Sequence, residues 1–544
     1  MHTLINRKTF ILVLIILAGA LFRFFRLGEY PIQLNHDEIS QLYDIRSILE
    51  TKKDIYGNFL PLAFPSTGDY KVGHYIYIST IPYLIFGNQE ATIRIPAAFF
   101  GTLTILAVFL FVKILTKNWL LAILSATVTV FTPSEIFYSR KSFENVIGSS
   151  LDLFGLFFLL KHLKEGAGRG WAILGVFVLV IAMYIYTSQT ILIPLLMLLL
   201  IILFRKKILE QRKDFLLIFV LWIIFVIPLI IITTVNPSLR FRAQSVFINQ
   251  DVNLGKVINL NANELKSYID FIPAKLLYQF DPDYLFLDGL DLTNQNAFDI
   301  GPLLIWQFPF LILGIIFLIK NGEFSTARKL LFGLTILAMI PSAVTFEDFS
   351  PHRSILSFTM MSIISAFGLY WLVRIIFRFG NLSLKILILT IIFTSLILNI
   401  VYFIRMYIVS YPHERSEKLQ YPFKEVSLYI WSEYNNFDQI IFDPKFGDTT
   451  PIIGVGTAYY LAYYGNYPPD KLQKELHSGN KPREVIFDKF SIREVFWPAD
   501  KDLKNTLIIV SPWSIPEHDI KDKSRIIRRF YFYNGALAFY AIRL

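Results

Sequence analysis

The chain has 544 residues, of which 54% are hydrophobic and 17% are charged, and its mean hydropathy is +0.51. This composition is far more apolar than that of a soluble protein and indicates a polytopic α-helical membrane protein. The formal net charge is +10, but many Lys and Arg residues lie in short loops between apolar runs, where membrane orientation explains them without a nucleic-acid partner. Because the chain has no cysteine, disulfides, thiolate nucleophiles and cysteine-bound metals are excluded.

About eleven apolar runs are long enough to cross the hydrocarbon core, which needs roughly 20 residues at 1.5 Å each. The first run follows Arg7 and Lys8 and has no small-residue cleavage site after it, so we expect an uncleaved signal anchor. Another run, 75–86, is short and contains Pro82, and we expect a helix lying in the membrane interface. The expected spans are 9–25, 95–115, 119–134, 146–162, 171–187, 189–204, 215–234, 301–319, 329–345, 354–373 and 385–408.

The positive charges predict the orientation of these spans. If the N-terminus is cytoplasmic, each short cytoplasmic loop carries Lys and Arg, as the positive-inside rule requires. We therefore expect a transmembrane catalytic domain over 1–410 with outer loops at 26–94 and 235–300, followed by an exported soluble domain over 411–544. The expected location is the plasma (inner) membrane, with the active site and the C-terminal domain on the outer or periplasmic face. The loop residues that carry this pattern include Lys113, Lys117, Lys161, Lys164, Arg169, Arg205, Lys206, Lys207, Arg328, Lys329, Arg374 and Arg378.

The C-terminal segment reads as a small α/β domain. Helical patterns occur around 423–434 and 458–464. The end of the chain predicts a hairpin over 525–544 through Asn534-Gly535, a dipeptide that favours a type I′ turn. Strands are expected at 439–442, 485–487, 495–497 and 506–510.

The first outer loop contains the triplet His36-Asp37-Glu38, with two adjacent acidic residues, within a short distance of an apolar span. A carboxylate near hydrocarbon must be paired, hydrated or used. One interpretation makes Asp37 a general base and Glu38 its helper. The alternative is that the triplet caps an interfacial helix that starts near Ile39, because Asp is a good N-cap and Glu suits a first turn.

Together the motifs of this loop resemble the first outer loop of the GT-C glycosyltransferases of family 39, which include protein O-mannosyltransferases and aminoarabinose transferases. The resemblance runs through most of 20–375 and implies the GT-C fold. It also implies a membrane enzyme that moves a sugar from a polyprenyl phosphate carrier to an acceptor hydroxyl, with Asp37 at the catalytic centre. The motifs are Arg26, Pro31-x5-Asp37-Glu38, Tyr56-Gly57-Asn58-x2-Pro61, Lys71 and Phe86-Gly87-Asn88-x5-Arg94-Ile95-Pro96.

The resemblance also suggests further site residues. Lys71 keeps the position of a phosphate-contacting Lys, although the Pro-Pro that follows it in aminoarabinose transferases is Val72-Gly73 here. Relatives place an acidic residue opposite the loop carboxylate, where this chain offers Glu144. Arg140, His352 and Arg353 are then candidates for binding the donor phosphate, and Arg94 and Asp283 are further outer-loop candidates.

Each of these assignments competes with a simpler interpretation. Arg140 and Glu144 have the spacing of a solvated helical ion pair, and His352-Arg353 suits an anchor to lipid head groups. Asp281-Pro282-Asp283 has the Asp-x-Asp form that holds a divalent cation on a diphosphate, but a polyprenyl monophosphate has no diphosphate to bridge and Asp-Pro is a common turn. We therefore expect no metal ligands and no certain cofactor.

The expected reaction is a single displacement that inverts the anomeric carbon, with a protein, lipid or glycan as the acceptor. The strongest competing function is that of a lipid or solute transporter or flippase. Transporters place ionisable groups near mid-bilayer on broken, repeated helices, whereas the charged clusters here lie in outer loops and at helix ends. A sensor with the C-terminal domain as its receptor would not need Asp37, and a single-subunit oligosaccharyltransferase would carry a Trp-Trp-Asp motif, which the C-terminal sequence lacks.

Overall fold

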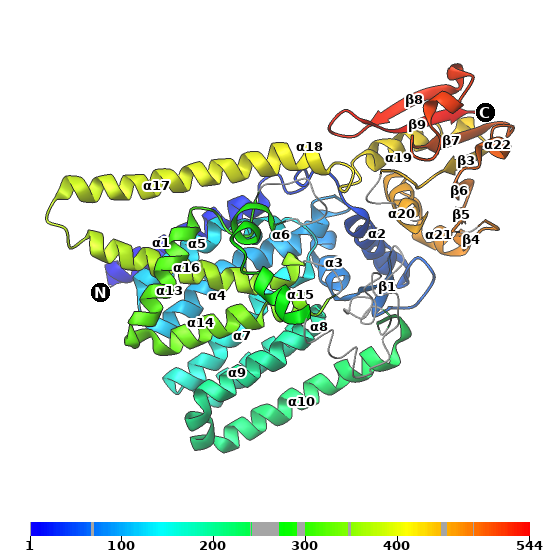
Figure 1. Cartoon of the computed structure of the whole chain (residues 1–544). Helices are drawn as coiled ribbons and strands as arrows, with labels where there is room; N and C mark the ends of the chain where they lie inside the picture. Colours follow the sequence, from blue (N-terminus) through cyan, green and yellow to red (C-terminus); the bar gives the residue numbers. More distant parts are fainter. Residues whose placement is uncertain are drawn as a thin grey trace. The chain divides into compact units, whose positions relative to one another are not determined.

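The computed structural model describes residues 2–66, 70–239, 241, 271–290, 300–345, 350–447, 454–481 and 483–544. The chain divides into two units, each made of two segments that are far apart in the sequence (Figure 1). The helical unit comprises Met1–Phe25 and Ile95–Met406, and the sheet unit comprises Arg26–Arg94 and Tyr407–Leu544. The loop 26–94, which the sequence analysis assigns to the membrane domain, thus belongs to the same unit as the C-terminal segment.

Every apolar run that the sequence predicts as a span contains helix in the structure. Short helical turns, η4 (Tyr284–Asp288), η5 (Gly322–Phe324) and η6 (Pro351–Ser354), lie between the longer helices. Most of the predicted outer loop 235–300 lies outside the described residues. The helices of the helical unit are α1 (His2–Phe24), α4 (Ile95–Thr116), α5 (Trp119–Phe131), α6 (Pro133–Ser139), α7 (Glu144–Glu165), α8 (Arg169–Ile185), α9 (Gln189–Glu210), α10 (Arg212–Val235), α13 (Gln307–Lys320), α14 (Ser325–Leu337), α15 (Ile340–Ala343), α16 (Ile355–Ile376) and α17 (Leu382–Arg405).

Length and hydropathy identify the chain as a multi-pass membrane protein. Among the described residues, six helices are long and apolar enough to cross a membrane. The pair α5 and α6 would add a seventh span, bent by 57° where Pro133 lacks the N–H that would continue the helix. The predicted number of eleven crossings stays a prediction.

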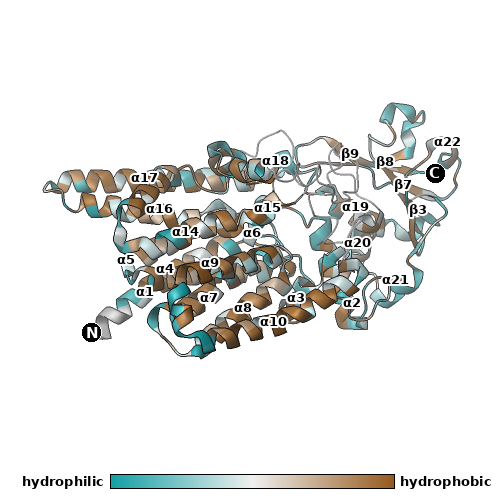
Figure 2. Cartoon of the chain, turned by 60° about the horizontal axis from the view of Figure 1, so that its bottom comes forward, coloured by the Kyte–Doolittle hydropathy of each residue, from teal (hydrophilic) through white to brown (hydrophobic). Residues whose placement is uncertain are grey.

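The burial of the helices fits a bundle in a lipid surrounding. α16 is almost entirely buried and packs closely against α13. Glycines permit this close approach, since a Cβ at Gly314 would lie 1.9 Å from Ile364 O and one at Gly368 would lie 2.0 Å from Phe310 O. α10 and α17 instead expose most of their apolar side chains. Their high hydropathy is visible as the brown colour of much of both helices in Figure 2. Long apolar helices with exposed apolar faces are typical of lipid contact.

The first loop of the sheet unit folds around a helix and a small hairpin. The helix α2 (His36–Thr51) buries Ile39, Leu42, Ile45 and Ile48 on its apolar face. The hairpin pairs β1 (Ala63–Pro65) with β2 (Tyr70–Val72), and α3 (His74–Phe86) and the turn η1 (Thr92–Arg94) follow. α3 confirms the helix predicted at 75–86, while its position in the membrane interface stays a prediction.

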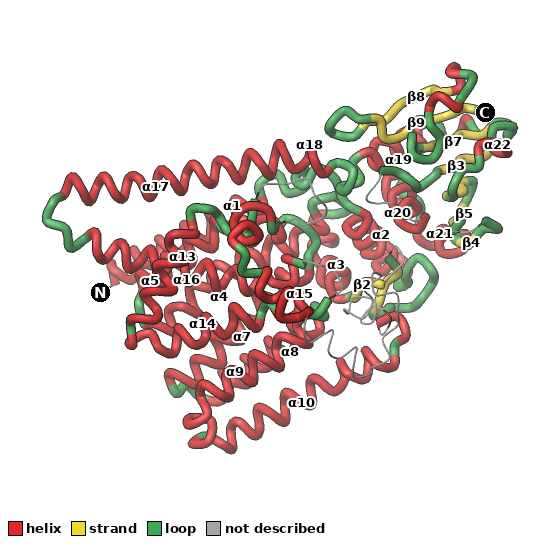
Figure 3. Tube along the Cα trace, in the orientation of Figure 1, coloured by secondary structure: helices red, strands yellow, loops and turns green. Residues whose placement is uncertain are grey.

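A seven-stranded mixed sheet forms the core of the C-terminal segment and confirms the predicted α/β class. Its strands are yellow in Figure 3. The strand order is β4-β5-β6-β3-β7-β9-β8, with β3 parallel to β6 and β7 and the other pairs antiparallel. The helices are α18 (Tyr411–Arg415), α19 (Pro422–Ser432), α20 (Gly454–Tyr464), α21 (Pro469–Glu475) and α22 (Trp497–Asp500). The strands are β3 (Gln439–Phe442), β4 (His477–Ser478), β5 (Val485–Phe487), β6 (Phe490–Ile492), β7 (Thr506–Val510), β8 (Ile526–Tyr531) and β9 (Leu537–Arg543).

Two local predictions for this segment are wrong. The strand expected at 495–497 is absent from these described residues, because Asp443 Oδ2 accepts the Val495 N–H at 2.9 Å and Trp497-Pro498 begins α22. Pro498 could not donate to a strand ladder. The hairpin between β8 and β9 exists, but of Asn534 and Gly535 only Gly535 has a positive φ, of 84°, so the turn is not type I′.

Candidate active site

The N-terminus of α2 is a complete capping box built by Asn35 and Glu38. Asn35 Oδ1 accepts the N–H groups of Asp37 at 3.0 Å and of Glu38 at 2.9 Å, and Glu38 Oε2 accepts the Asn35 N–H at 3.3 Å. The helix therefore starts at His36 and not near Ile39, and Asp37 is not its N-cap. Of the triplet that was the alternative cap, Glu38 does take part in capping. The cap is Asn35, so helix capping does not account for the Asp37 side chain.

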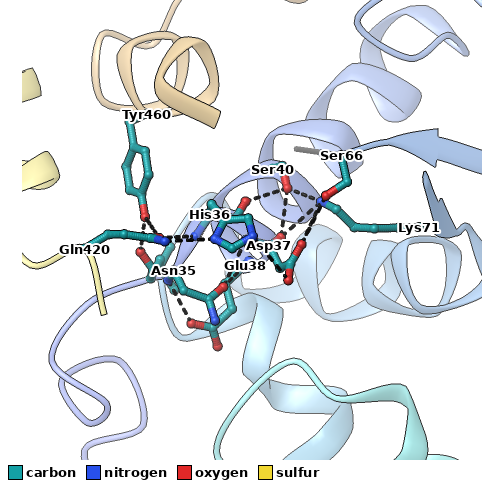
Figure 4. Close-up of polar contacts among 10 residues, drawn as sticks. Asn35, His36, Asp37, Glu38, Ser40, Ser66, Lys71, Gln420 and Tyr460 are labelled. Atoms are coloured by element: carbon teal, nitrogen blue, oxygen red, sulfur yellow. Dashed lines mark hydrogen bonds and ion pairs between the residues drawn. The ribbon is translucent and has the colours of Figure 1, made fainter. Parts of the chain in front are cut away.

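The half-exposed Asp37 carboxylate lies among polar groups from three segments of the first loop (Figure 4). Ser66 Oγ donates to Asp37 Oδ1 at 3.2 Å, and Lys71 Nζ lies 4.0 Å from the same oxygen. The neighbouring His36 places its Nε2 at 3.7 Å from Asp37 Oδ2. An exposed carboxylate beside a cation and a hydroxyl can accept a proton from a group that arrives from solvent.

Lys71 is held beside Asp37 by the hairpin. It lies in β2 opposite Phe64, and only 8% of its side chain is exposed. Its ammonium donates to Ser40 Oγ and, at 3.3 Å, to Asp37 O, so both partners come from the first turns of α2. A buried ammonium requires such partners, and they fix its position at the Asp37 end of the helix.

Glu38 and Arg94 meet in a buried ion pair. Arg94 Nε and Nη2 donate to Glu38 Oε1 and Oε2, each at 2.9 Å. The remaining N–H groups of Arg94 donate to Leu27 O at 3.0 Å, Pro31 O at 2.9 Å and Gln33 O at 2.7 Å. Glu38, predicted as a helper of the base, and Arg94, predicted as an outer-loop candidate, thus tie the segment before α2 to the end of the loop.

The other sequence-predicted site residues belong to the helical unit. Arg140 donates to Phe22 O at 2.9 Å, Arg23 O at 3.2 Å and Phe25 O at 2.9 Å, which are carbonyls at the end of α1. A cation is favourable at the negative end of a helix, so Arg140 anchors α1. Glu144 is the first residue of α7, where the helix dipole favours a carboxylate.

The structure brings the Glu144 segment and the His352 segment together. The Phe143 ring stacks on the His352 ring with centroids 5.5 Å apart, and Asn145 Nδ2 donates to His352 O. Arg353 Nη1 donates to Ser350 Oγ at 2.9 Å in the turn before α16. Two acidic residues that shortly precede this turn in the sequence, Glu347 and Asp348, lie outside the described residues.

Asp281 and Asp283 form a turn. Asp281 Oδ1 accepts the Asp283 N–H at 3.0 Å just before η4, as in a common Asp turn. Within the described part of the chain, His, Asp and Glu side chains form no group of three that could hold a metal ion.

Sequence reasoning missed four polar residues of the sheet unit that lie on α2 or make hydrogen bonds at or near it. They are Asp44 on α2 itself, Gln420, and the adjacent Tyr459 and Tyr460 of α20. Asp44 follows Asp37 by seven residues and so lies on the same face of the helix, among buried apolar neighbours. This spacing is a signal that could have revealed Asp44, whereas no local pattern indicates contacts from Gln420 or Tyr460.

Comparison with known proteins agrees with this architecture. Residues 74–232 match the family model described as dolichyl-phosphate-mannose-protein mannosyltransferase. No curated protein sequence matches the chain. The structure of ArnT from Cupriavidus metallidurans in the apo state is similar over 97% of both chains, with 13% identity and a TM-score of 0.56.

Two other solved structures show the same likeness. ArnT bound to undecaprenyl phosphate matches over 97% of both chains with 12% identity and a TM-score of 0.56. The oligosaccharyltransferase of Archaeoglobus fulgidus in the apo form matches over 98% of this chain and 74% of its own, with 11% identity and a TM-score of 0.53. The chain therefore has a fold similar to that of ArnT and of the archaeal oligosaccharyltransferase, and its residues 74–232 match the mannosyltransferase family model.

Proposed function

We propose that this protein is a membrane glycosyltransferase that moves a sugar from a polyprenyl phosphate donor to a hydroxyl group of an acceptor on the outer face of the membrane. The observation that carries the proposal is the position of Asp37, a half-exposed carboxylate 4.0 Å from the buried ammonium of Lys71. The GT-C fold and the solved relative bound to undecaprenyl phosphate support this substrate class.

The proposed reaction is one displacement at the anomeric carbon. The acceptor oxygen bonds to that carbon on the face opposite the phosphate, while the carbon–oxygen bond to the phosphate breaks and its electron pair leaves with the phosphate. Asp37 accepts the acceptor proton, and the products are an inverted glycoside and a polyprenyl phosphate. Lys71 stabilises the charge that grows on the leaving phosphate.

In the helical unit we propose Arg353, with Arg140 and His352, as further contacts of the donor phosphate, and Glu144 as a second acidic group. This part rests on the resemblance of the sequence. The hydrogen bonds of Arg140 to the end of α1 favour an anchoring role for that residue, so Arg353 is the stronger candidate. The proposal requires only that the acceptor carries a hydroxyl group, and it does not choose between a protein, a lipid and a glycan.

The test uses the purified full-length chain and synthetic undecaprenyl phosphate sugars. Mannose comes first because of the matched family, followed by glucose, galactose and aminoarabinose, and release of undecaprenyl phosphate is measured. Asp37→Asn cannot take a proton, so turnover should fall about 10²- to 10⁴-fold while thermal stability stays parental. The matched control is Glu50→Gln on the same helix, whose side chain is 47% exposed against 48% for Asp37.

Near-parental turnover by Asp37→Asn would remove Asp37 from the mechanism and leave Glu144 as the next candidate base. If the parent released no undecaprenyl phosphate from any donor of the panel, the proposed substrate class would be wrong.

A further inference from the structure

Two buried residues of the C-terminal segment contact the start of α2, where Asp37 lies: Gln420 at His36, and Tyr460 at Leu34 just before the helix (Figure 4). Gln420 Oε1 accepts the His36 N–H at 2.6 Å, and Gln420 Nε2 lies 2.9 Å from His36 Nδ1. The Tyr460 hydroxyl donates to Leu34 O at 2.6 Å and lies 3.0 Å from Gln420 Oε1. Both contacts join distant parts of the sequence, and both lie within the sheet unit.

These contacts complete the hydrogen bonding of the helix start. The first N–H groups of a helix have no partner inside it. Asn35 satisfies those of Asp37 and Glu38, and Gln420 satisfies that of His36. The backbone on both sides of Asp37 is therefore fixed, on one side by the capping box and on the other by the C-terminal segment.

The same contacts set the proton position on His36. Gln420 Oε1 accepts the backbone N–H of His36, so the amide must direct its NH₂ group at His36 Nδ1. His36 Nδ1 is then an acceptor, and the ring proton of the neutral imidazole lies on Nε2. That nitrogen is the one 3.7 Å from Asp37 Oδ2, so its N–H dipole is near the carboxylate.

The chain adopts a costly conformation to make these contacts. Gln420 has a φ of 57°, in the left-handed region that disfavours residues with a side chain, and it is buried. Tyr460 is fully buried, and desolvation, with Glu38, Asp37 and Glu90 nearby, raises the pKa of its hydroxyl well above the usual range, so it remains a donor. Strain and burial of this kind are expected where a residue is held in place for function.

We propose that Gln420 and Tyr460 are positioning residues of the transfer reaction, through which the C-terminal domain holds Asp37 and His36 in the orientation that the acceptor needs. They act through the first turn of α2 and not by touching the reacting atoms. This inference rests on the proposed function, because it assigns Asp37 as the base. It gives the C-terminal domain a part in catalysis.

The test compares Gln420→Met and Tyr460→Phe with Tyr43→Phe in the full-length chain. Tyr43 is a matched control, because its hydroxyl also joins α2 to the C-terminal segment, at Tyr467 O and 2.9 Å, but further along the helix from Asp37. The donor is the undecaprenyl phosphate sugar that the parent uses best. We expect kcat to fall about tenfold or more in Gln420→Met and somewhat less in Tyr460→Phe, because misplaced catalytic groups lose rate steeply. The KM for the donor should stay within about twofold of the parent in both, and Tyr43→Phe should behave as the parent.

A double variant separates positioning from general damage. Once Asp37→Asn has removed the base, Gln420→Met should cost less than about twofold further, since residues that act as one unit are not additive. An equal loss in both backgrounds, or a parental kcat for both Gln420→Met and Tyr460→Phe, overturns the inference. Parental turnover by Asp37→Asn would instead remove Asp37 as the base, the part of the proposed function on which this inference rests. If Gln420→Met does not fold, Tyr460→Phe, which lacks one oxygen atom, decides alone.

Discussion

Arg94 and Glu38 form a bidentate ion pair with both N–O distances at 2.9 Å, and both side chains are buried. The five N–H groups of Arg94 all have oxygen partners, which a guanidinium taken out of water requires. Glu38 and Asp37 are neighbours in the sequence, but their carboxylates have different surroundings. Glu38 is held by one cation inside the protein, whereas Asp37 is half exposed.

This difference predicts that two similar substitutions change stability to different extents. Glu38→Gln leaves the Arg94 charge buried without its counter-ion and should lower the free energy of unfolding by about 3–5 kcal/mol. Asp37→Asn should leave it unchanged, because Asn35 caps the helix in either case. Thermal melting of both purified variants checks this. A Glu38→Gln variant that melts with the parent but loses sugar transfer would make Glu38 the catalytic helper.

Asp44 predicts a pH dependence of stability. Its buried carboxyl accepts from the Tyr459 hydroxyl at 3.0 Å, and burial raises its pKa to about 8, with Asp54 adding to the rise and Lys71 and Tyr459 opposing it. The unfolded group has a pKa of about 3.9, so between about pH 4 and pH 8 the folded chain binds a proton that the unfolded chain releases. The contribution of Asp44 to stability therefore decreases as the pH rises through this window.

Asp44→Asn should remove this contribution. Its melting temperature relative to the parent should rise from about pH 5 to about pH 8, because only the parent loses stability through proton release from Asp44. Melting curves at both pH values measure it, and Glu50→Gln, an exposed change on the same helix, is the control. A constant difference between Asp44→Asn and the parent would mean that Asp44 is already ionised at pH 5.

Arg353 separates phosphate binding from membrane anchoring. If its guanidinium binds the donor phosphate, Arg353→Lys should weaken binding of undecaprenyl phosphate about tenfold, since a point charge replaces a planar fork. An anchor to lipid head groups would tolerate the change. Equilibrium binding to the protein in nanodiscs is the measurement. Arg374→Lys, at the other end of α16, is the matched control and should bind as the parent. Equal affinity of Arg353→Lys and the parent would assign Arg353 to the anchor.

The orientation is open to a direct experiment. A reporter that is active only outside the cytoplasm should work when fused after Leu544 and fail when inserted at Gly168, between α7 and α8. The expectation follows from the positive charges of the predicted cytoplasmic loops. Activity at Gly168, or inactivity at Leu544, would invert or break the predicted topology.

The features that sequence predicted well are those that depend on local patterns. Hydropathy located helix in every predicted span, and the strand at 439–442 coincides with β3, because burial by lipid or by a sheet leaves a mark on consecutive residues. The strand predicted at 495–497 failed because Asp443 accepts the Val495 N–H and Trp497-Pro498 begins a helix. Local pattern cannot show which distant side chain supplies a hydrogen bond.

The candidate site illustrates that limit. Asp37 stood out because two acidic residues near a membrane span are unusual. Lys71 stood out because the motifs of its loop resemble those of a known family. The bond from Gln420 to His36 spans 384 residues and has no signature, since glutamine is an ordinary loop residue. The buried ion pair of Glu38 likewise depends on Arg94, which lies 56 residues away in the sequence.

The division of the sheet unit into two distant segments sets an order of events during synthesis. Leu34 O can accept its hydrogen bond from Tyr460 only after the ribosome has made that tyrosine, which is 426 residues further along the chain. At roughly 5–20 residues per second, the ribosome needs about 20 to 85 s to make that interval. During this time the first loop is present without the contacts from Gln420 and Tyr460. Under the proposed function, the protein would acquire its activity only after Gln420 and Tyr460 have been synthesised, and a product terminated before them would insert into the membrane without the proposed positioning contacts.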